Sequence, residues 1–336
     1  MLPLITRFCA CIVLLVAAFT AALAEPYDAA RPAVAEFVEE MVEKHGMNRA
    51  WLNSLLGEAR YQQSIIDAIS RPAEKTLEWH EYRKIFVNAK RINAGVKFWQ
   101  DQRETLSAIA GQTGVPEHII VAIIGVETYY GRIKGSYRVI DSLATLAFDY
   151  PPRSKFFRSE LEEFLLLAQE EQLDPLVPKG SYAGAMGSPQ FISSSFRNYA
   201  VDGSGDGRRD LWDDWQDIIA SVANYFTRHG WRAGEPVAAR VAPPGSSGLE
   251  LLNERADLNT TILELRNRGV GLHTPLDNGQ PAMLFKLTAE SGPEYWVGFR
   301  NYYVITRYNR SLMYAMAVKQ LGEKIAEQME ETVALN

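Results

Sequence analysis

The sequence predicts a mainly α-helical protein of the α+β class, with a small antiparallel sheet near its C-terminal end. Apolar residues recur at three- and four-residue spacings along much of the chain up to Trp231, which is the period of an α-helix. Beyond Trp231 the chain changes to short runs of β-type composition, separated by turn sequences such as Asp277-Asn278-Gly279. The helical spacing then returns in Leu312–Glu331.

Residues 1–24 have the features of a secretory signal peptide. Arg7 supplies the positive charge, Ile12–Leu23 the apolar segment, and Ala22-Leu23-Ala24 the small-residue cleavage site. The alternative is an uncleaved membrane anchor, for which the apolar run is short. Cys9 and Cys11 precede most of the apolar segment, so neither stands where a lipid-modified cysteine should follow it. We therefore expect a soluble protein exported to the periplasm, without a stable membrane anchor.

The composition of the exported part, residues 25–336, excludes several classes of protein. It has no cysteine, so it can form no disulfide and offers no thiolate nucleophile or ligand. The full chain has a formal net charge of −6 and no basic run, so we expect no nucleic-acid partner.

The histidines lack the spacing of a metal motif, and the sequence contains no phosphate-binding loop motif. We expect no organic cofactor and a monomeric state.

Helical segments follow from the apolar spacing, with Arg71-Pro72 as a connection and Pro116 in the first turn of a central helix. These segments are Ala33–Glu43, Ala50–Leu56, Trp79–Trp99, Glu117–Glu127, Ser142–Ala147, Ser154–Glu170, Trp215–His229 and Leu312–Glu331. The β-type runs are Pro236–Val241, Ala282–Leu287 and Glu294–Thr306. The predicted units are a helical domain (25–110), a core (111–232), a small β domain (233–306) and a C-terminal helix (307–336) that returns to the helical domain or its cleft.

The segment Ile119–Arg132 contains the first candidate catalytic residue. It is an apolar run that ends on Glu127, which is followed by a threonine, two tyrosines and a glycine. A carboxyl group among apolar residues is costly to ionise, which raises its pKa and lets it act as a general acid near neutral pH. Because a lone glutamate at a helix end more often caps or pairs there, Glu127 needs support from other segments.

Two further segments carry side chains suited to a sugar polymer. Ser181–Phe191 is rich in small residues, which let a backbone approach a ligand, and Gln190 offers both a donor and an acceptor. A plain connector stiffened by Pro189 is the alternative. Arg300–Tyr314 is dense in tyrosine and asparagine, and tyrosine rings stack on sugars. Packing between the sheet and the last helix is the alternative for some of these rings.

The sequence from Asp202 to Asp213 has the spacing of an EF-hand cation loop. Oxygen side chains stand at loop positions 1, 3, 5, 9 and 12, and Gly207 occupies position 6, where such a loop turns sharply. Asp213 is shorter than the usual closing glutamate, so Asp214 or Asp217 could close the loop instead. The candidate ligands are Asp202, Ser204, Asp206, the Arg208 carbonyl, Asp213 and Asp217. The alternative is an acidic turn with helix-capping aspartates.

The motifs GVETYYGR, SYAGAMGSPQF, the Asp202 loop, SVANYF and ITRYNRSLMYAMAV, in this order, resemble the membrane-bound lytic transglycosylase B family, glycoside hydrolase family 103. The resemblance extends from about Tyr82 to the last helix. It implies a lysozyme-like helical core with a flanking helical domain and a small β domain. It also implies cleavage of the MurNAc–GlcNAc β-1,4 bond of peptidoglycan without water, leaving a 1,6-anhydromuramoyl end.

The resemblance also implies roles for individual residues, of which Glu127 matches the family's single catalytic acid and base. Residues that match the lining of the sugar cleft or the surroundings of the catalytic carboxyl are Tyr82, Ser181, Gln190, Tyr225, Tyr308, Asn309 and Tyr314. Arg153 matches one of a pair of arginines in some members, but its neighbour here is Pro152. In the family the aspartate loop is similar to a structural calcium site with a longer closing segment. Asp217 is the nearer match to its last ligand, although this chain carries one extra residue there.

A single carboxyl group suffices for this reaction if the substrate supplies the nucleophile. Protonated Glu127 would donate to the glycosidic oxygen, and the neighbouring N-acetyl group would share the charge at C1. Glu127 would then accept the proton of the C6 hydroxyl as that oxygen attacks C1. Two alternatives are a muramidase that uses water and a second carboxylate, and a calcium-stabilised peptidoglycan-binding protein without turnover. The sequence does not distinguish cleavage at chain ends from cleavage within strands.

Overall fold

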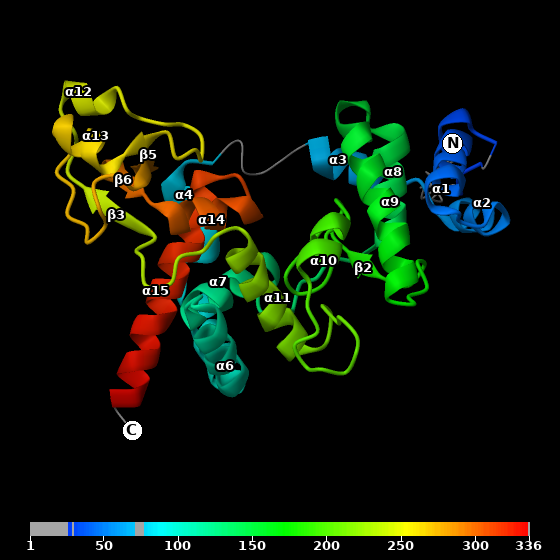
Figure 1. Cartoon of the computed structure of the whole chain (residues 1–336), viewed down its shortest axis with the longest axis horizontal. Coiled ribbons are helices and arrows are strands. Elements are labelled where there is room, and N and C mark those ends of the chain that lie inside the picture. Colours follow the sequence, from blue (N-terminus) through cyan, green and yellow to red (C-terminus); the bar gives the residue numbers. More distant parts are fainter. Residues whose placement is uncertain (1–25, 29, 71–76, 335–336) are drawn as a thin grey trace, which may run out of the picture.

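The computed structural model describes residues 26–28, 30–70 and 77–334, and the fold is mainly helical (Figure 1). The helices are α1 (Pro32–His45), α2 (Arg49–Glu58), α3 (Gln63–Ser70), α4 (Trp79–Phe86), α5 (Ala89–Asp101), α6 (Arg103–Thr113), α7 (Glu117–Thr128), α8 (Val139–Asp149), α9 (Ser154–Glu170), α10 (Ser193–Tyr199), α11 (Trp215–Arg228), α12 (Ser246–Leu249), α13 (Ile262–Asn267), α14 (Arg300–Tyr308) and α15 (Leu312–Ala334). The strands are β1 (Tyr137–Arg138), β2 (Lys179–Gly180), β3 (Ala238–Val241), β4 (Thr260–Thr261), β5 (Pro281–Ala289) and β6 (Gly292–Gly298).

The predicted signal peptide, residues 1–24, lies outside the described residues. Among the helices that the structure describes, none is by itself long and apolar enough to cross a membrane. The pair α6 and α7 meets the criteria of length and composition together, but the two helices are bent by 116° relative to one another.

The helices pack in two groups (Figure 1). In one group, α1 and α3 lie against α8 and α9; Tyr27 donates to Asp149 over 2.7 Å, and Arg31 pairs with the same carboxylate at 2.7 Å. In the other group, α5, α6, α11 and α15 surround α7. The residues of α7 from Ile119 to Val126 are all buried, as expected of a helix that is apolar on every side.

The main sheet is antiparallel, with strand order β3-β6-β5-β4. Because successive side chains of a strand point to opposite faces, β5 contributes to two cores. Met283 and Phe285 belong to the core of the helical body, whereas Leu284 packs in a separate cluster with Ile262 and Val297. The sheet is therefore covered on both faces, by α4 and α14 on one side and by α13 on the other (Figure 1).

Two predicted segments differ from the structure. The run Trp79–Trp99 is not one helix, because the chain breaks after Phe86 and Asn88 starts α5 by accepting a hydrogen bond from the Arg91 amide over 3.1 Å. The β-type run Glu294–Thr306 is a strand only as far as Gly298. Its remainder is helical α14, which buries Tyr302 and Ile305, so packing overrides the β-type composition there.

The C-terminal helix α15 packs along α4, α5, α7 and α14. It crosses the helical body beneath the sheet, and its first turn meets the end of α7 (Figure 1). The division of the chain into four domains stays a prediction.

Candidate active site

Glu127 is half-buried in the last turn of α7, one residue before the helix ends. Tyr314, in the first turn of α15, donates its hydroxyl to the Oε1 atom of Glu127. Residues 187 positions apart in the chain thus meet at the end of the central helix.

Helix α7 ends in a strained turn directly after Glu127. Tyr129 and Tyr130 both have left-handed backbones, with φ of 52° and 60°, a conformation that costs about 1–2 kcal/mol for each residue with a side chain. Their amides close the helix by donating to the carbonyls of Gly125 and Ile124, each over 3.2 Å. Strain of this kind persists only where the surrounding structure holds it.

Tyr130 is held by two helical glycines. A Cβ at Gly125 would lie 2.7 Å from the Tyr130 ring, and a Cβ at Gly95 would lie 2.5 Å from the Tyr130 hydroxyl. That hydroxyl donates to the carbonyl of Arg91 over 2.9 Å. The absence of side chains at these positions lets the ring lie flat between α5 and α7 and offsets the strain of the turn.

Arg91 of α5 also supports this turn, and the sequence analysis did not identify it. Its Nη1 donates to the carbonyl of Gly125, and its guanidinium lies over the rings of Tyr129 (4.8 Å) and Phe86 (5.2 Å). Burial lowers the pKa of Arg91 from its usual value. A glycine inside a helical run, such as Gly95 or Gly125, is the sequence signal for close packing of this kind.

Three tyrosines lie near the carboxyl group of Glu127: Tyr225 and Tyr314 are buried, and Tyr308 is partly buried. Burial, and then the charge of Glu127, raise the pKa of Tyr308 and of Tyr314 well above the usual value. Burial likewise raises the pKa of Tyr225, whose hydroxyl donates to the Arg307 carbonyl over 2.6 Å. These phenols are therefore neutral hydrogen-bond donors at physiological pH.

The segment Ser181–Phe191 is tied to the end of α7. The hydroxyl of Thr128, the residue after Glu127, donates to the Ser188 carbonyl over 2.8 Å, and Tyr308 donates to the Pro189 carbonyl over 2.9 Å. Gln190 has a left-handed backbone, and its Nε2 donates to the carbonyls of Gly187 (2.9 Å) and Lys134 (3.2 Å). Ser181 accepts a hydrogen bond from the Ala185 amide over 3.1 Å, so its hydroxyl stabilises the turn.

The remaining predicted site residues come from three other places in the chain. Tyr82 is buried on α4, and its effect on the pKa of Tyr314 places it close to that phenol. Asn309 directly follows α14. Arg153 lies in the 3₁₀ turn before α9, where its guanidinium stacks on Phe156 at 4.4 Å and Phe157 at 4.9 Å. The tyrosines thus gather at Glu127, whereas Arg153 contacts the helix that follows it.

The aspartate loop is ordered by its own amides. Asp202 accepts from the amides of Gly205 (2.6 Å) and Gly207 (2.8 Å). Asp217 of α11 accepts from the amides of Gly203 (2.8 Å) and Asp210 (2.7 Å), which closes the loop. Asp213 instead pairs with Lys134 at 3.2 Å. Asp217, and not Asp213, therefore holds the two ends of the loop together through backbone amides.

The electrostatics of the two loop aspartates differ. Hydrogen bonds from the loop amides, Gly207 first, lower the pKa of the exposed Asp202. Burial raises the pKa of Asp217, although three amides oppose this effect. In the part of the chain that the structure describes, no three His, Cys, Asp or Glu side chains are gathered closely enough to hold a metal ion. The loop thus carries the oxygen ligands that calcium prefers, but its carboxylates do not converge on one point.

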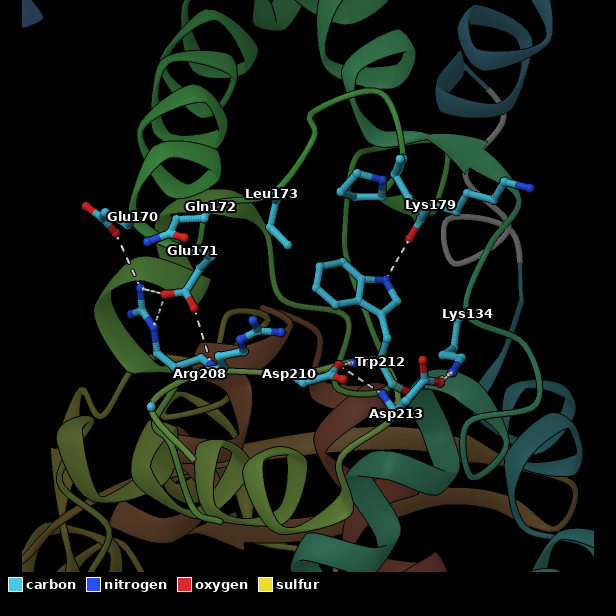
Figure 2. A pocket seen from close by; sticks show the side chains of 14 residues that line it. Lys134, Glu170, Glu171, Gln172, Leu173, Lys179, Arg208, Asp210, Trp212 and Asp213 are labelled. Carbon is cyan, nitrogen blue, oxygen red and sulfur yellow. Dashed lines mark hydrogen bonds and ion pairs between the residues drawn. The ribbon is translucent and has the colours of Figure 1, made fainter. Parts of the chain in front are cut away.

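A cavity of about 770 Å³ is lined by the second half of this loop, by the residues at the end of α9, and by Lys134 and Lys179 (Figure 2). Trp212 donates to the Lys179 carbonyl over 3.1 Å, and Lys134 donates to the Trp212 carbonyl over 2.7 Å. Glu171 on the opposite wall pairs with Arg209 (Figure 2). Neither Glu127 nor its tyrosines line this cavity.

Comparisons with known proteins show the family to which the chain belongs. A family model described as the transglycosylase SLT domain matches residues 29–323. The membrane-bound lytic murein transglycosylase B of Escherichia coli (strain K12) is 43% identical over 307 residues, which make up 88% of this chain and 83% of that protein. The chain therefore belongs to the transglycosylase SLT domain family.

Solved structures have the same fold. The catenated lytic transglycosylase SltB1 from Pseudomonas aeruginosa matches with a TM-score of 0.86 and 52% identity over 89% of this chain and 98% of that one. The E. coli lytic transglycosylase Slt35 in complex with calcium matches with a TM-score of 0.82 and 43% identity, over 91% of this chain and 96% of that one. P. aeruginosa SltB3 in complex with NAG-NAM-pentapeptide matches with a TM-score of 0.74 and 28% identity, over 87% of this chain and 78% of that one. These matches confirm the resemblance and the mainly helical fold class predicted from the sequence.

Proposed function

We infer that the protein is a lytic murein transglycosylase, an enzyme that cleaves the MurNAc–GlcNAc β-1,4 bond of peptidoglycan and leaves a 1,6-anhydroMurNAc end. The observation that carries this inference is the position of Glu127. In a chain of the SLT domain family, its carboxyl group lies at the end of the buried helix α7 and is held by Tyr314. A hydrogen bond from a fixed donor sets the direction of a carboxyl group, which general acid catalysis requires.

The proposed reaction uses Glu127 twice. As an acid, Glu127 protonates the glycosidic oxygen, and the bond to C1 breaks. The N-acetyl group of the substrate shares the positive charge at C1. As a base, the Glu127 carboxylate then accepts the proton of the C6 hydroxyl while that oxygen bonds to C1, so no water enters the product. Tyr314 stabilises the carboxylate between the two steps, because its raised pKa keeps the proton on the phenol.

The other predicted site residues form the proposed sugar cleft. We propose substrate contacts for the residues that the family resemblance implies: Tyr82, Arg153, Ser181, Gln190, Tyr225, Tyr308, Asn309 and Tyr314. The connection of the Gln190 turn to α7 through Thr128 and Ser188 supports this assignment, since it fixes a polar side chain beside the catalytic helix. Arg153 belongs to a different part of the chain from the Gln190 turn, the 3₁₀ turn before α9, and is assigned by the resemblance alone.

We further propose that the aspartate loop binds a structural calcium ion. The ligands would be Asp202, Ser204, Asp206, the Arg208 carbonyl and Asp217, without Asp213. The calcium complex of the related Slt35 supports this proposal. An ion among these oxygens would stabilise the loop that precedes α11 and would take no part in the reaction.

The proposed cellular location rests on the named relatives and on the predicted signal peptide. The named relatives are bacterial lytic transglycosylases, and the E. coli one is called membrane-bound. For this chain we propose export by residues 1–24, a soluble monomer in the periplasm, and peptidoglycan glycan strands as its partner.

Mass spectrometry of muropeptides tests the proposed function. Purified residues 25–336 would be incubated with isolated peptidoglycan beside a Glu127→Gln variant. Products lighter by one water than hydrolysed muropeptides, absent with the variant, are the expected result. Reducing-end products would indicate a muramidase that uses water instead. Folded protein that binds peptidoglycan but forms no products would indicate a binding protein without turnover.

A further inference from the structure

A second cavity, of about 520 Å³, lies where the sheet meets the helical body. We call it the junction cavity. Four segments line it: the start of α4 with the two residues before it, residues 252–254, residues 286–288 of β5, and the turn at residues 310–313. Nothing in the proposed reaction uses this cavity.

The junction cavity shares its inner wall with the candidate active site. The turn Arg310–Met313 leads directly to Tyr314, which donates to Glu127. This wall is fixed, because the buried Tyr302 donates to the Leu312 carbonyl over 2.6 Å. Consecutive Cα atoms are about 3.8 Å apart, so the Cα atoms of this wall lie within roughly 15 Å of the Cα atom of Tyr314. A substituent on a sugar bound at Glu127 could therefore reach the cavity.

Two cations line the cavity without an ion pair among the described residues, Lys286 of β5 and Arg310. Both side chains are exposed. Two acidic residues also line it. These are Glu78, which caps the first turn of α4 and keeps its charge, and Glu254; both are exposed. The lining thus carries two cations and two carboxylates, which suit a zwitterionic ligand with carboxylates and an ammonium group.

The lining does not suit a bare sugar. Glycan subsites present aromatic faces on which sugar rings stack. Among the described residues that line the junction cavity, the one aromatic side chain is Trp79, and it is only 2% exposed. Leu252, Leu287 and Leu312 supply apolar surface instead. An apolar lining with a few charged groups is typical of a ligand-binding pocket, and here it offers contacts for both the apolar and the charged groups of a peptide.

We propose that the junction cavity binds the peptide stem of peptidoglycan, with its carboxylates on Lys286 and Arg310. This inference rests on the proposed function, because the stem reaches the cavity only when its glycan lies at Glu127. The related SltB3 in complex with NAG-NAM-pentapeptide carries such a stem on its saccharide. The cavity would make the enzyme prefer strands with peptides to strands without them.

The test compares two substrates: glycan strands that carry peptides, and the same strands after an amidase has removed them. The readout is the ratio of kcat/KM for the two substrates. In Lys286→Glu and in Arg310→Gln this ratio should fall about three- to tenfold, the usual effect of one charge-assisted contact. The fall should shrink as salt is raised, since the contacts are exposed. Lys90→Glu, an exposed lysine that does not line the cavity, should keep the wild-type ratio.

Three outcomes are informative. A wild-type ratio in both Lys286→Glu and Arg310→Gln would overturn the proposal. Equal losses on both substrates, in variants with unchanged unfolding temperatures, would assign the cavity to the glycan and also overturn it. If the wild-type protein released no product from either substrate, the proposed function would fail before the cavity was tested, so the two failures are distinguishable.

Discussion

The guanidinium of Arg91 lies 4.8 Å from the centre of the Tyr129 ring, two residues beyond Glu127. The same group donates to the carbonyl of Gly125, two residues before Glu127. Arg91 therefore contacts the chain on both sides of the candidate catalytic residue. Because Tyr129 and Tyr130 are left-handed, this turn is strained and depends on such contacts.

We predict that Arg91→Met lowers kcat about tenfold and leaves KM within about twofold, because a small displacement of a catalytic group affects the reaction more than binding. The variant removes the donor to Gly125 and the cation over Tyr129, so the end of α7 loses its support. Steady-state kinetics on peptidoglycan measure both constants. Lys90→Met, at the preceding exposed position, is the matched control.

Arg91→Lys separates charge from geometry. Lysine keeps the positive charge but lacks the planar fork that donates and stacks at once. We expect it to restore only part of kcat. Wild-type kcat in Arg91→Met, with the variant folded, would show that Arg91 does not position Glu127.

Tyr314→Phe tests the hydrogen bond to Glu127. The variant keeps the buried ring but removes the donor, and we expect kcat to fall by about 10²-fold, as for other donors that stabilise charge in a transition state. Tyr302→Phe is a matched control, because it removes a buried hydroxyl that donates to the Leu312 carbonyl, on the same stretch of chain. That loss should cost about 1 kcal/mol of unfolding free energy and should not change kcat by more than about twofold. Similar kcat values for the two variants would contradict a role for Tyr314 in catalysis.

The sequence predicted those parts of the fold that depend on local pattern. The bounds of α9 match the predicted segment Ser154–Glu170, and α7 is the buried helix that its uniform apolar run indicates. Where packing opposes composition, prediction failed: the tyrosines, valine and isoleucine of α14 have β-type composition, yet they form a helix between β6 and α15.

Prediction of the site was limited in the same way. Glu127 stood out because one charged residue ends an apolar run. Arg91 did not, because its relation to Glu127 exists only in space: α5 lies beside α7, and the Arg91 guanidinium contacts a carbonyl and two rings. The tie between Thr128 and Ser188 likewise joins residues 60 positions apart through a backbone carbonyl, which leaves no pattern in the sequence.

Calcium should stabilise the wild-type protein and should not stabilise Asp217→Asn to the same extent. The structure closes the loop with Asp217, whose carboxylate accepts from the Gly203 and Asp210 amides. An ion that binds only the folded state adds about 2.7 kcal/mol when its concentration is about 100 times Kd. Thermal unfolding with calcium and with a chelator measures this difference.

Asp213→Asn is the matched control for the loop, because Asp213 pairs with Lys134. We expect it to keep the full calcium effect. A calcium effect lost in Asp213→Asn and kept in Asp217→Asn would reverse the assignment. No calcium effect in the wild-type protein would mean that the loop is held by its amides alone.

The stability of the protein should decrease as the pH is lowered through about 6.5, the usual pKa of an unfolded histidine. Burial, and then the charges of Arg307 and Arg300, lower the pKa of His229 in the folded protein, against the hydrogen bond with the Tyr225 carbonyl. Between the folded and the unfolded pKa the unfolded chain binds more protons, so acid favours unfolding. The stability that His229 contributes is therefore present above pH 6.5 and lost below it.

The variant His229→Gln should show a smaller loss of unfolding free energy between pH 8 and pH 5.5 than the wild-type protein. Denaturant unfolding at both pH values measures the two losses. Burial raises the pKa of Glu160, which makes a contribution of opposite sign at lower pH. That contribution is common to both proteins, so the difference between them isolates His229. Equal losses in the two proteins would show that His229 does not cause the pH dependence.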